Sequence, residues 1–261
     1  MLVMAEIDAT VPHSARIWNY WLGGKDYYPV DKAMGDQIME FFPEIAENAR
    51  GNRGFLCRVV RHLANAGVRQ FLDIGTGLPA VDPTHEVAQR IVPEARIVYV
   101  DNDPLVLVHA RALLTSTPEG TTDYLDADVE EPGAILQAAA QTLDFSQPVA
   151  LLLVGIMQFV QDDAEAHAIV NRLLAALPSG SYMVLTHPTN AVRGPRMDEA
   201  VRQWNEAGGS PRLRLRTPTE ISHFFKELDV IDPGVVSTSL WHPDTGDPAP
   251  IDDHGALARK P

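Results

Sequence analysis

The sequence of 261 residues is poor in cysteine, in long apolar runs and in positive charge. Its one cysteine, Cys57, excludes an intrachain disulfide framework and suits a reducing cytoplasm. It has no run of about 18 apolar residues, which excludes a membrane-spanning helix. The first 14 residues contain acids and lack a basic region ahead of an apolar one, which argues against a secretory signal. We therefore expect a cytoplasmic protein without a membrane partner.

The charge excludes another class of partner. The chain has 21 Lys and Arg against 35 Asp and Glu, a formal net charge of −14. Proteins that grip a phosphate backbone usually have a basic surface, so we expect no nucleic-acid partner. The local basic segment "RLRLR", residues 212–216, alternates with period 2 and predicts an edge strand or extended arm with a solvated charged face. A small-molecule partner is favoured, and the oligomeric state stays open.

Two helices are predicted at the start, one over 29–47 that could be interrupted near Pro43 and one from about 52 to 66, and we predict a helical N-terminal cap over residues 1–66. Short runs that are apolar on both faces follow, separated by helical patterns. This alternation predicts an α/β domain over residues 67–261 with a mostly parallel sheet covered on both sides. The predicted strands are 68–74, 95–101, 122–128, 150–156 and 181–187, and the predicted helices between them are 84–91, 104–115, 133–142 and 164–177.

The end of the chain has a different pattern. Residues 227–241 predict a strand with a Pro-Gly break, and residues 255–260 predict a last short strand. Without a helical pattern between them, they favour an antiparallel pair that closes the sheet edge. The intervening segment 241–255 is rich in Pro, Gly and Asp, which predicts an exposed loop.

A glycine turn follows the first strand, in "FLDIGTGLPA". The spacing Gly75-x-Gly77-x-x-Ala80 satisfies the loose dinucleotide pattern. Prolines flank the place where a pyrophosphate-binding helix would begin, and a proline removes an amide that a pyrophosphate needs. Asp73, just ahead of the turn, disfavours a diphosphate and tolerates a cationic ligand. The turn alone leaves a dinucleotide and another nucleoside as alternatives.

Acidic residues end the next two strands. Asp101 can accept both hydroxyls of a ribose. Asp126 or Asp128 could accept from an exocyclic amine while the Val129 amide donates to a ring nitrogen, an arrangement that recognises adenine. A ligand with an adenine, a ribose and a cationic group, without a diphosphate, fits S-adenosylmethionine.

These motifs in their order resemble the class I, Rossmann-like methyltransferases. Together with "PHSARIWNYWLGGKDYYPVD", "ENARGNRGFLCRVVRHL" and "DVIDPGVV", they are similar to an S-adenosyl methyltransferase family common in actinomycetes, from about residue 11 to the end. The resemblance implies a mostly parallel seven-stranded sheet with an antiparallel last strand, a helical cap and S-adenosylmethionine as cofactor. It implies these cofactor-binding residues: Gly75, Thr76 and Gly77 under the amino-acid portion, Asp101 and Asn102 at the ribose and adenine, Asp128 and Val129 at the adenine edge, and Gly155 and Ile156 below the methionine portion.

Two departures limit the resemblance. Leu78-Pro79 stands where the fullest form of the glycine motif has a third glycine. No Asn-Pro-Pro-Tyr-like sequence follows "LLLVGI", which counts against methylation of nucleic-acid bases.

The aromatic N-terminal stretch predicts a lid. The segment "LGGKD", residues 22–26, is a candidate hinge, and aromatic faces such as that of Tyr20 can stabilise a sulfonium. Trp18 and Trp21 could equally pack a helix on the sheet. Arg53 is a candidate partner for the cofactor's carboxylate, with Arg16 and Lys25 as alternatives.

A base is needed only where the acceptor must lose a proton. His187, in "THPT", is the first candidate, although a histidine before proline is often a structural residue, and Tyr28 is a weaker one. The remaining histidines have no metal-ligand spacing, so no metal is predicted. We expect methyl transfer from S-adenosylmethionine to an unidentified small molecule. An NAD-dependent oxidoreductase and a noncatalytic nucleoside-binding or regulatory protein remain as alternatives.

Overall fold

A central sheet of eight strands organises the chain, of which the computed structural model describes residues 8–113 and 115–261. The strand order is β3-β2-β1-β4-β5-β8-β6, and β7 pairs with β8. Strands β1 to β5 are parallel neighbours, whereas β8 runs antiparallel to β5, β6 and β7. This confirms the predicted class I methyltransferase architecture, with eight strands where seven were predicted, because the Pro-Gly break at 233–234 divides the strand expected over 227–241 into two short ones. The strands are β1 (Gln70–Ile74), β2 (Arg96–Asp101), β3 (Thr121–Asp126), β4 (Ala150–Val154), β5 (Tyr182–Pro188), β6 (Asp229–Val230), β7 (Val236–Ser237) and β8 (Asp253–Arg259).

Helices cover both faces of the sheet because the central strands are apolar on both faces. Every residue of β1 is buried. One apolar cluster joins the sheet to α6, α7 and α9, and a second joins its other face to α3 and α4. The helices are α1 (Ser14–Trp21), α2 (Pro29–Phe41), α3 (Ile45–Asn65), α4 (Thr84–Gln89), α5 (Pro104–Leu113), α6 (Pro132–Ala139), α7 (Asp163–Ala175), α8 (Pro195–Glu206) and α9 (Pro218–His223), with short 3-10 turns at Met157–Phe159 and Thr238–Leu240.

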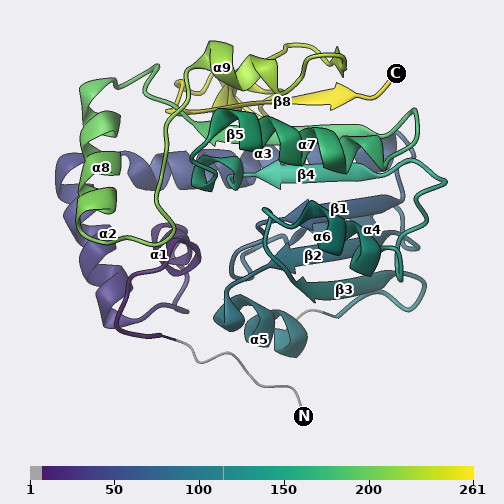
Figure 1. Ribbon diagram of the computed structural model, residues 1–261, viewed down its shortest axis with the longest axis horizontal. Helices are drawn as coiled ribbons and strands as arrows, with labels where there is room; N and C mark the ends of the chain where they lie inside the picture. Colours follow the sequence, from purple (N-terminus) through teal and green to yellow (C-terminus); the bar gives the residue numbers. More distant parts are fainter. Residues whose placement is uncertain (1–7, 114) are drawn as a thin grey trace.

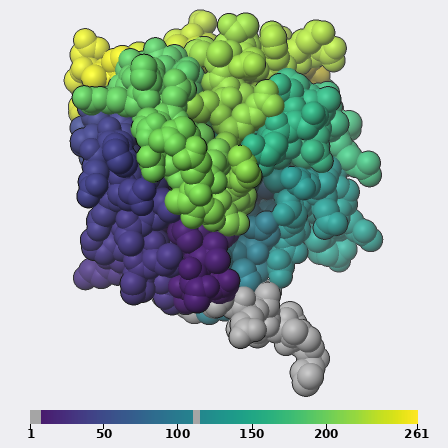
Figure 2. All heavy atoms as spheres, turned by 60° about the vertical axis from the view of Figure 1, so that its left-hand side comes forward, coloured from purple at the N-terminus to yellow at the C-terminus, as the bar shows by residue number. Residues whose placement is uncertain are grey.

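Helices α1, α2 and α8 stand together beyond the carboxyl ends of the parallel strands (Figure 1). A third apolar cluster holds them, with Ile17 from α1, Ile38 from α2 and Trp204 from α8. In Figure 2 the green segment that contains α8 lies beside the purple and indigo N-terminal helices. The sequence did not predict α8 or α9, so a helix from the far end of the chain joins the N-terminal ones unexpectedly.

The N-terminal helices differ in detail from the prediction. The helix expected over 29–47 ends at Phe41, and α3 begins at Ile45, beyond Pro43. The apolar face of α3 packs on the sheet through residues such as Val59 and Leu63. Residues 1–7 of the predicted cap lie outside the described residues. The boundary at residue 66 stays a prediction.

Two surface predictions hold only in part. The segment 241–255 is exposed only in its middle, because Trp241 packs under α3 and Asp252 is fully buried. The arginine-rich segment 212–216 is extended without strand pairing, and Arg216 is buried through contacts with Asp163 and with backbone carbonyls. No described helix is long and apolar enough to cross a membrane.

Candidate functional site

A cleft of about 210 Å³ lies where β1, β2 and β4 end and α1 faces them. One wall comes from the turns after these strands, at 73–78, 100–102 and 154–156, and from the loop 127–130 after β3. The other comes from α1 and the middle of α3. Open α/β sheets bind ligands at this edge, outside the carboxyl ends of the strands.

The turn after β1 is shaped by two glycines in the left-handed region. Gly75 has φ of 77° and Gly77 has φ of 67°. The Gly75 amide donates to the Val100 carbonyl at 2.8 Å, which fastens the turn to β2. A Cβ on Gly75 would lie 2.7 Å from the Cβ of Ile156, whereas a Cβ on Gly77 would meet nothing within 4 Å. Gly75 therefore permits close packing, and Gly77 leaves space open at the cleft.

The carboxylate of Asp101 faces this turn from the end of β2. Its Oδ2 accepts the Gly77 amide at 2.8 Å, and its Oδ1 accepts the Asp103 amide at 3.0 Å. Burial raises the pKa of Asp101, and these two hydrogen bonds oppose that shift. A carboxylate offers about four lone-pair positions, so two remain for hydroxyl groups of a ligand.

The cleft is acidic. Asp73, Asp101, Asp128 and Glu130 line it, and among its described lining residues Arg53 is the one permanently cationic side chain. Burial raises the pKa of Asp73 to about 6, and the Thr84 hydroxyl donates to it at 2.7 Å. Such a lining suits a ligand with a sulfonium and an ammonium group better than one with a diphosphate.

Arg53 and Asn102 frame the two ends of the cleft. The Nε and Nη2 atoms of Arg53 donate to the carbonyls of Val81 and Asp82. Within the described residues no hydrogen bond engages its Nη1, which is therefore available to an anionic group. Asn102 donates to Asp128 Oδ2 at 2.7 Å, so a residue assigned to the ribose and adenine already contacts one assigned to the adenine edge.

Helix α1 supplies the wall opposite the glycine turn. His13 precedes it and contacts Asp103 at 2.9 Å, which ties the helix to the loop after β2. Trp18 and Asn19 face the cleft. The segment 22–26 packs against α1, since a Cβ on Gly24 would lie 2.2 Å from Asn19 Oδ1. The hinge predicted there stays a prediction.

The structure brings most of the predicted site residues together and leaves three apart. The residues that line the cleft are Arg53, Asp73, Gly75, Thr76, Gly77, Asp101, Asn102, Asp128, Val129, Gly155 and Ile156. Tyr20, Tyr28 and His187 do not line it. Their predicted roles depended on position in the sequence, and their surroundings give each of them another function.

Tyr20 and Tyr28 have structural partners. The Tyr20 hydroxyl hydrogen-bonds to Asp36, and its ring meets that of Tyr27 edge-on at 5.0 Å. Tyr28 precedes α2 and packs against a small apolar cluster, with the Arg16 guanidinium 5.2 Å from its ring centre. Neither side chain is placed to meet a cofactor in the cleft.

His187 is fully buried within β5. Its Nδ1 lies 2.8 Å from the Pro188 carbonyl and its Nε2 lies 2.8 Å from Arg216 Nη1, so both ring nitrogens have protein partners. Burial, with the Arg216 charge, lowers the pKa of His187 to about 3. The geometry does not support the general-base role that we expected, because neither nitrogen can reach a substrate.

A second cavity of about 80 Å³, which we call the chamber, adjoins the cleft. Helices α1, α2, α3 and α8 and the start of β8 line it. The residues common to both cavities are Ser14, Trp18, Asn52, Gly155, Gln158 and Phe159. The sequence analysis missed the chamber because its walls come from several segments that are distant in the sequence, and no spacing along the chain signals such a convergence.

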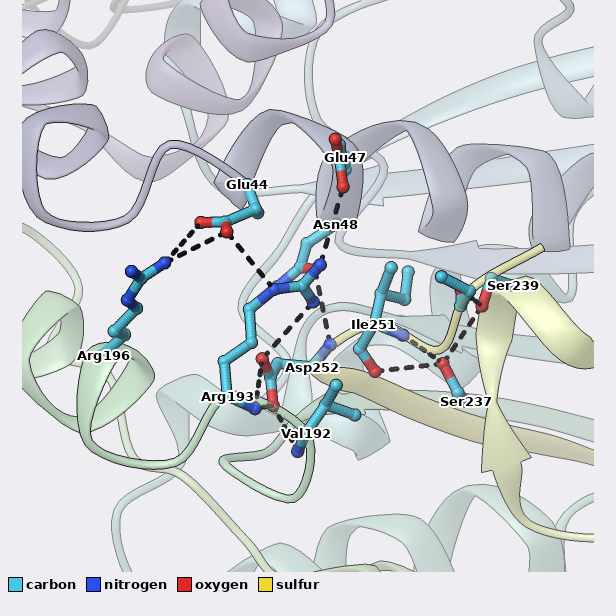
Figure 3. A network of polar contacts seen from close by, with 11 residues as sticks. Glu44, Glu47, Asn48, Val192, Arg193, Arg196, Ser237, Ser239, Ile251 and Asp252 are labelled. Carbon is cyan, nitrogen blue, oxygen red and sulfur yellow. Dashed lines mark hydrogen bonds and ion pairs between the residues drawn. The ribbon is translucent and has the colours of Figure 1, made fainter.

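One corner of the chamber is held by a polar network around Asp252 (Figure 3). Its Oδ1 accepts the amides of Val192 at 2.8 Å and Arg193 at 3.0 Å. The Arg193 guanidinium lies within ion-pair distance of Asp252, Glu44 and Glu47. The network therefore ties the loop before α8 to the start of α3 and to the residue before β8.

Among the described residues, no group of three or more His, Cys, Asp or Glu side chains could hold a metal ion. The open Gly77 turn, the two free acceptor positions of Asp101 and the acidic lining fit the ribose and the cationic portion of S-adenosylmethionine.

Comparison with known proteins gives the family. The model of the family described as S-adenosyl methyltransferase matches residues 2–261. A DUF574 family protein from Streptomyces avermitilis is 45% identical, with a TM-score of 0.94 over 98% of this chain and 100% of its own. A structure from Thermobifida fusca, named as a methyltransferase, is 38% identical, with a TM-score of 0.89 over 97% of each chain.

A more distant structure shares only the fold. Magnesium protoporphyrin IX methyltransferase from Synechocystis, solved with bound S-adenosylhomocysteine, is 13% identical, with a TM-score of 0.53 over 94% of this chain and 93% of its own. No curated protein matches the chain. The chain belongs to the S-adenosyl methyltransferase family, and its cofactor is S-adenosylmethionine.

Proposed function

We propose that this protein transfers the methyl group of S-adenosylmethionine to a small organic acceptor. The observation that carries the proposal is the chamber, which shares six lining residues with the cofactor cleft. Methyl transfer needs two ligands in contact, and a cofactor cleft that continues into a second cavity provides room for both.

The cleft residues have separate roles in this proposal. Asp101 accepts the ribose hydroxyls, and Asp128 with the Val129 amide binds the adenine edge. The segment from Gly75 to Gly77 passes under the amino-acid portion of the cofactor. Arg53, with its Nη1 atom, pairs with the cofactor's carboxylate.

The bound cofactor supplies a methyl carbon that its sulfonium already activates. The chain's own residues then have to align the acceptor and exclude water. Trp18 and Phe159 stand at the junction of the two cavities, where they restrict the approach of an acceptor to one direction and displace solvent.

The two alternatives have less support. No comparison supports an NAD-dependent oxidoreductase, and four acidic residues line the cleft where a diphosphate would have to lie. A noncatalytic nucleoside-binding protein needs no acceptor space, so the chamber favours catalysis.

The test is calorimetric titration with S-adenosylmethionine, S-adenosylhomocysteine and NAD. We expect the two sulfur nucleosides to bind and NAD not to bind. Asp101→Asn keeps the shape of the side chain but replaces the charged carboxylate by a neutral amide, which accepts weaker hydrogen bonds from the ribose hydroxyls. The Kd for S-adenosylmethionine should rise by about 10- to 100-fold. Asp126→Asn is the matched control, because Asp126 is the register partner of Asp101 on β3 and does not line the cleft. Binding of NAD alone, or equal effects of the two variants, would contradict the proposal.

A further inference from the structure

The chamber has the walls of a site for an aromatic ring. Trp18, Trp21 and Trp204, three of the chain's four tryptophans, line it together with Phe159. Its volume of about 80 Å³ corresponds to on the order of six water-sized groups, which is the size of one substituted ring. No Lys or Arg is among its described lining residues, so nothing there would neutralise a carboxylate on the ligand.

Two buried polar atoms at the chamber have no partner within the described residues. Gln158 is 6% exposed, and its Nε2 donates to the Gly155 carbonyl at 2.7 Å, which leaves Oε1 unpaired. Asn48 is 2% exposed, and its Oδ1 accepts the Asp252 amide at 3.3 Å, which leaves Nδ2 unpaired. Buried polar groups are rarely left without partners, so an acceptor and a donor here point to a ligand with a hydrogen-bonding group.

The two carboxylates at the chamber differ in their surroundings. Asp252 accepts two backbone amides and lies within ion-pair distance of Arg193, so its oxygens already have protein partners. Asp253 accepts only neutral donors, Asn52 Nδ2 at 2.8 Å and Thr238 Oγ1 at 3.0 Å, and both bond to the same oxygen, Oδ2. Burial without a cationic partner raises the pKa of Asp253 to about 7, within the range useful to a general base at neutral pH.

Asp253 also lies beside the junction of the two cavities. Asn52, which hydrogen-bonds to it, lines both the cleft and the chamber. A group held in the chamber can therefore face the cofactor's methyl carbon while its proton faces the carboxylate.

We propose that the chamber takes a small phenol as methyl acceptor, and that Asp253 accepts the hydroxyl proton as the oxygen is methylated. This inference rests on the proposed function. The phenol ring packs among the tryptophans, its hydroxyl oxygen accepts a hydrogen bond from the unpaired Asn48 Nδ2, and its one proton faces Asp253.

The step balances. The phenol O–H bond breaks, and its proton passes to the Asp253 carboxylate. An oxygen lone pair forms the new O–CH₃ bond as the S–CH₃ bond breaks, and the electron pair of that bond stays on sulfur. The products are an aryl methyl ether, S-adenosylhomocysteine and a protonated Asp253, which later releases its proton to solvent.

Binding is tested first, on protein saturated with S-adenosylhomocysteine, by titrating phenol, aniline and benzoate and following tryptophan fluorescence. We expect phenol to change the emission and benzoate not to do so. Ala200→Leu, which places a larger side chain in the chamber wall, should weaken phenol binding by at least about tenfold. Ala207→Leu is the control, because it makes the same change at an exposed position at the end of the same helix. No response to phenol, or equal responses in the two variants, overturns the chamber assignment.

Catalysis is tested by comparing phenol with 4-nitrophenol in mildly alkaline buffer, where 4-nitrophenol is largely ionised and phenol is not. Asp253→Asn keeps an oxygen for Asn52 and Thr238 but cannot take a proton. It should lower methyl transfer to phenol by about 100-fold or more and leave the rate with 4-nitrophenol within a few fold. An equal loss with both acceptors indicates a structural role and overturns the assignment of Asp253. Turnover of aniline without turnover of phenol overturns the acceptor class.

The proposed function fails separately from this inference. If S-adenosylmethionine does not bind, the methyltransferase proposal fails before any acceptor is added. If it binds and phenol neither binds nor reacts, the proposed function stands and the phenol chamber is refuted.

Discussion

The two glycines after β1 allow a paired test, because adding the same methyl group has different consequences at each. Both residues have positive φ, so Gly75→Ala and Gly77→Ala each carry the left-handed penalty of about 1–2 kcal/mol. At Gly75 the new methyl also lies 2.7 Å from the Cβ of Ile156. A Cβ does not move when its side chain rotates, so the backbone must shift, and overpacking of this kind adds about 1–3 kcal/mol. A Cβ added at Gly77 would have no atom within 4 Å, so Gly77→Ala carries no overpacking cost.

Cofactor binding should respond in the opposite order to stability. The methyl of Gly77→Ala projects into open space at a residue that lines the cleft, so it competes with the ligand rather than with the protein. We expect at least about a tenfold rise in the Kd for S-adenosylmethionine in this variant.

Thermal unfolding and calorimetric titration of the two variants check the pair. Gly75→Ala should melt below Gly77→Ala by roughly 2–12 °C, from about 2–4 °C for each kcal/mol in a protein of this size. A larger loss of stability in Gly77→Ala, with unchanged affinity, would refute the reading of the turn as a cofactor cradle.

Three further predictions concern single side chains. His187→Gln can keep both hydrogen bonds of His187, so methyl transfer should stay within a few fold in a turnover assay. The pKa of His187 is lowered from 6.5 to about 3, so its stabilising contribution is present above pH 6.5 and is lost as the pH falls toward 3. In thermal unfolding, acid should therefore destabilise the wild type more than His187→Gln. The pKa of Asp253 is raised from 3.8 to about 7, so its stabilising contribution is present below pH 3.8 and is lost as the pH rises to 7. Over that interval the free energy of unfolding of Asp253→Asn should rise relative to that of the wild type, by at most about 4 kcal/mol, and its melting temperature should rise with it. A difference that stays constant with pH would refute the shift. Tyr20→Phe loses the hydrogen bond with Asp36. Because Tyr20 does not line the cleft, the Kd for S-adenosylmethionine should stay within about twofold of the wild-type value. A tenfold loss of affinity would restore the predicted cofactor-binding role of Tyr20.

Local patterns in the sequence were enough to predict the sheet and the residues that line the cleft. The apolar runs of β1, β2, β4 and β5 are continuous in sequence, so the residues of each strand by themselves predict that it is buried on both faces. The cleft residues follow the ends of those strands, and parallel strands bring their carboxyl ends to one edge. Asp73, Asp101 and Asp128 could therefore be placed together without coordinates.

The chamber and the status of the candidate bases were decided by tertiary packing. Asp252 and Asp253 sit in a segment whose composition predicts an exposed loop, and only the packing of β8 against β5 and α3 buries them. His187 is placed correctly at the end of its strand, but its pKa is lowered by burial and by the charge of Arg216, 29 residues further along the chain. Burial and the charge of distant neighbours fix a pKa, and neither is encoded in the residues adjacent to the group. The sequence by itself determined the sheet, the family and the cofactor edge, while the acceptor space and its candidate base arose only where segments distant in the sequence pack together.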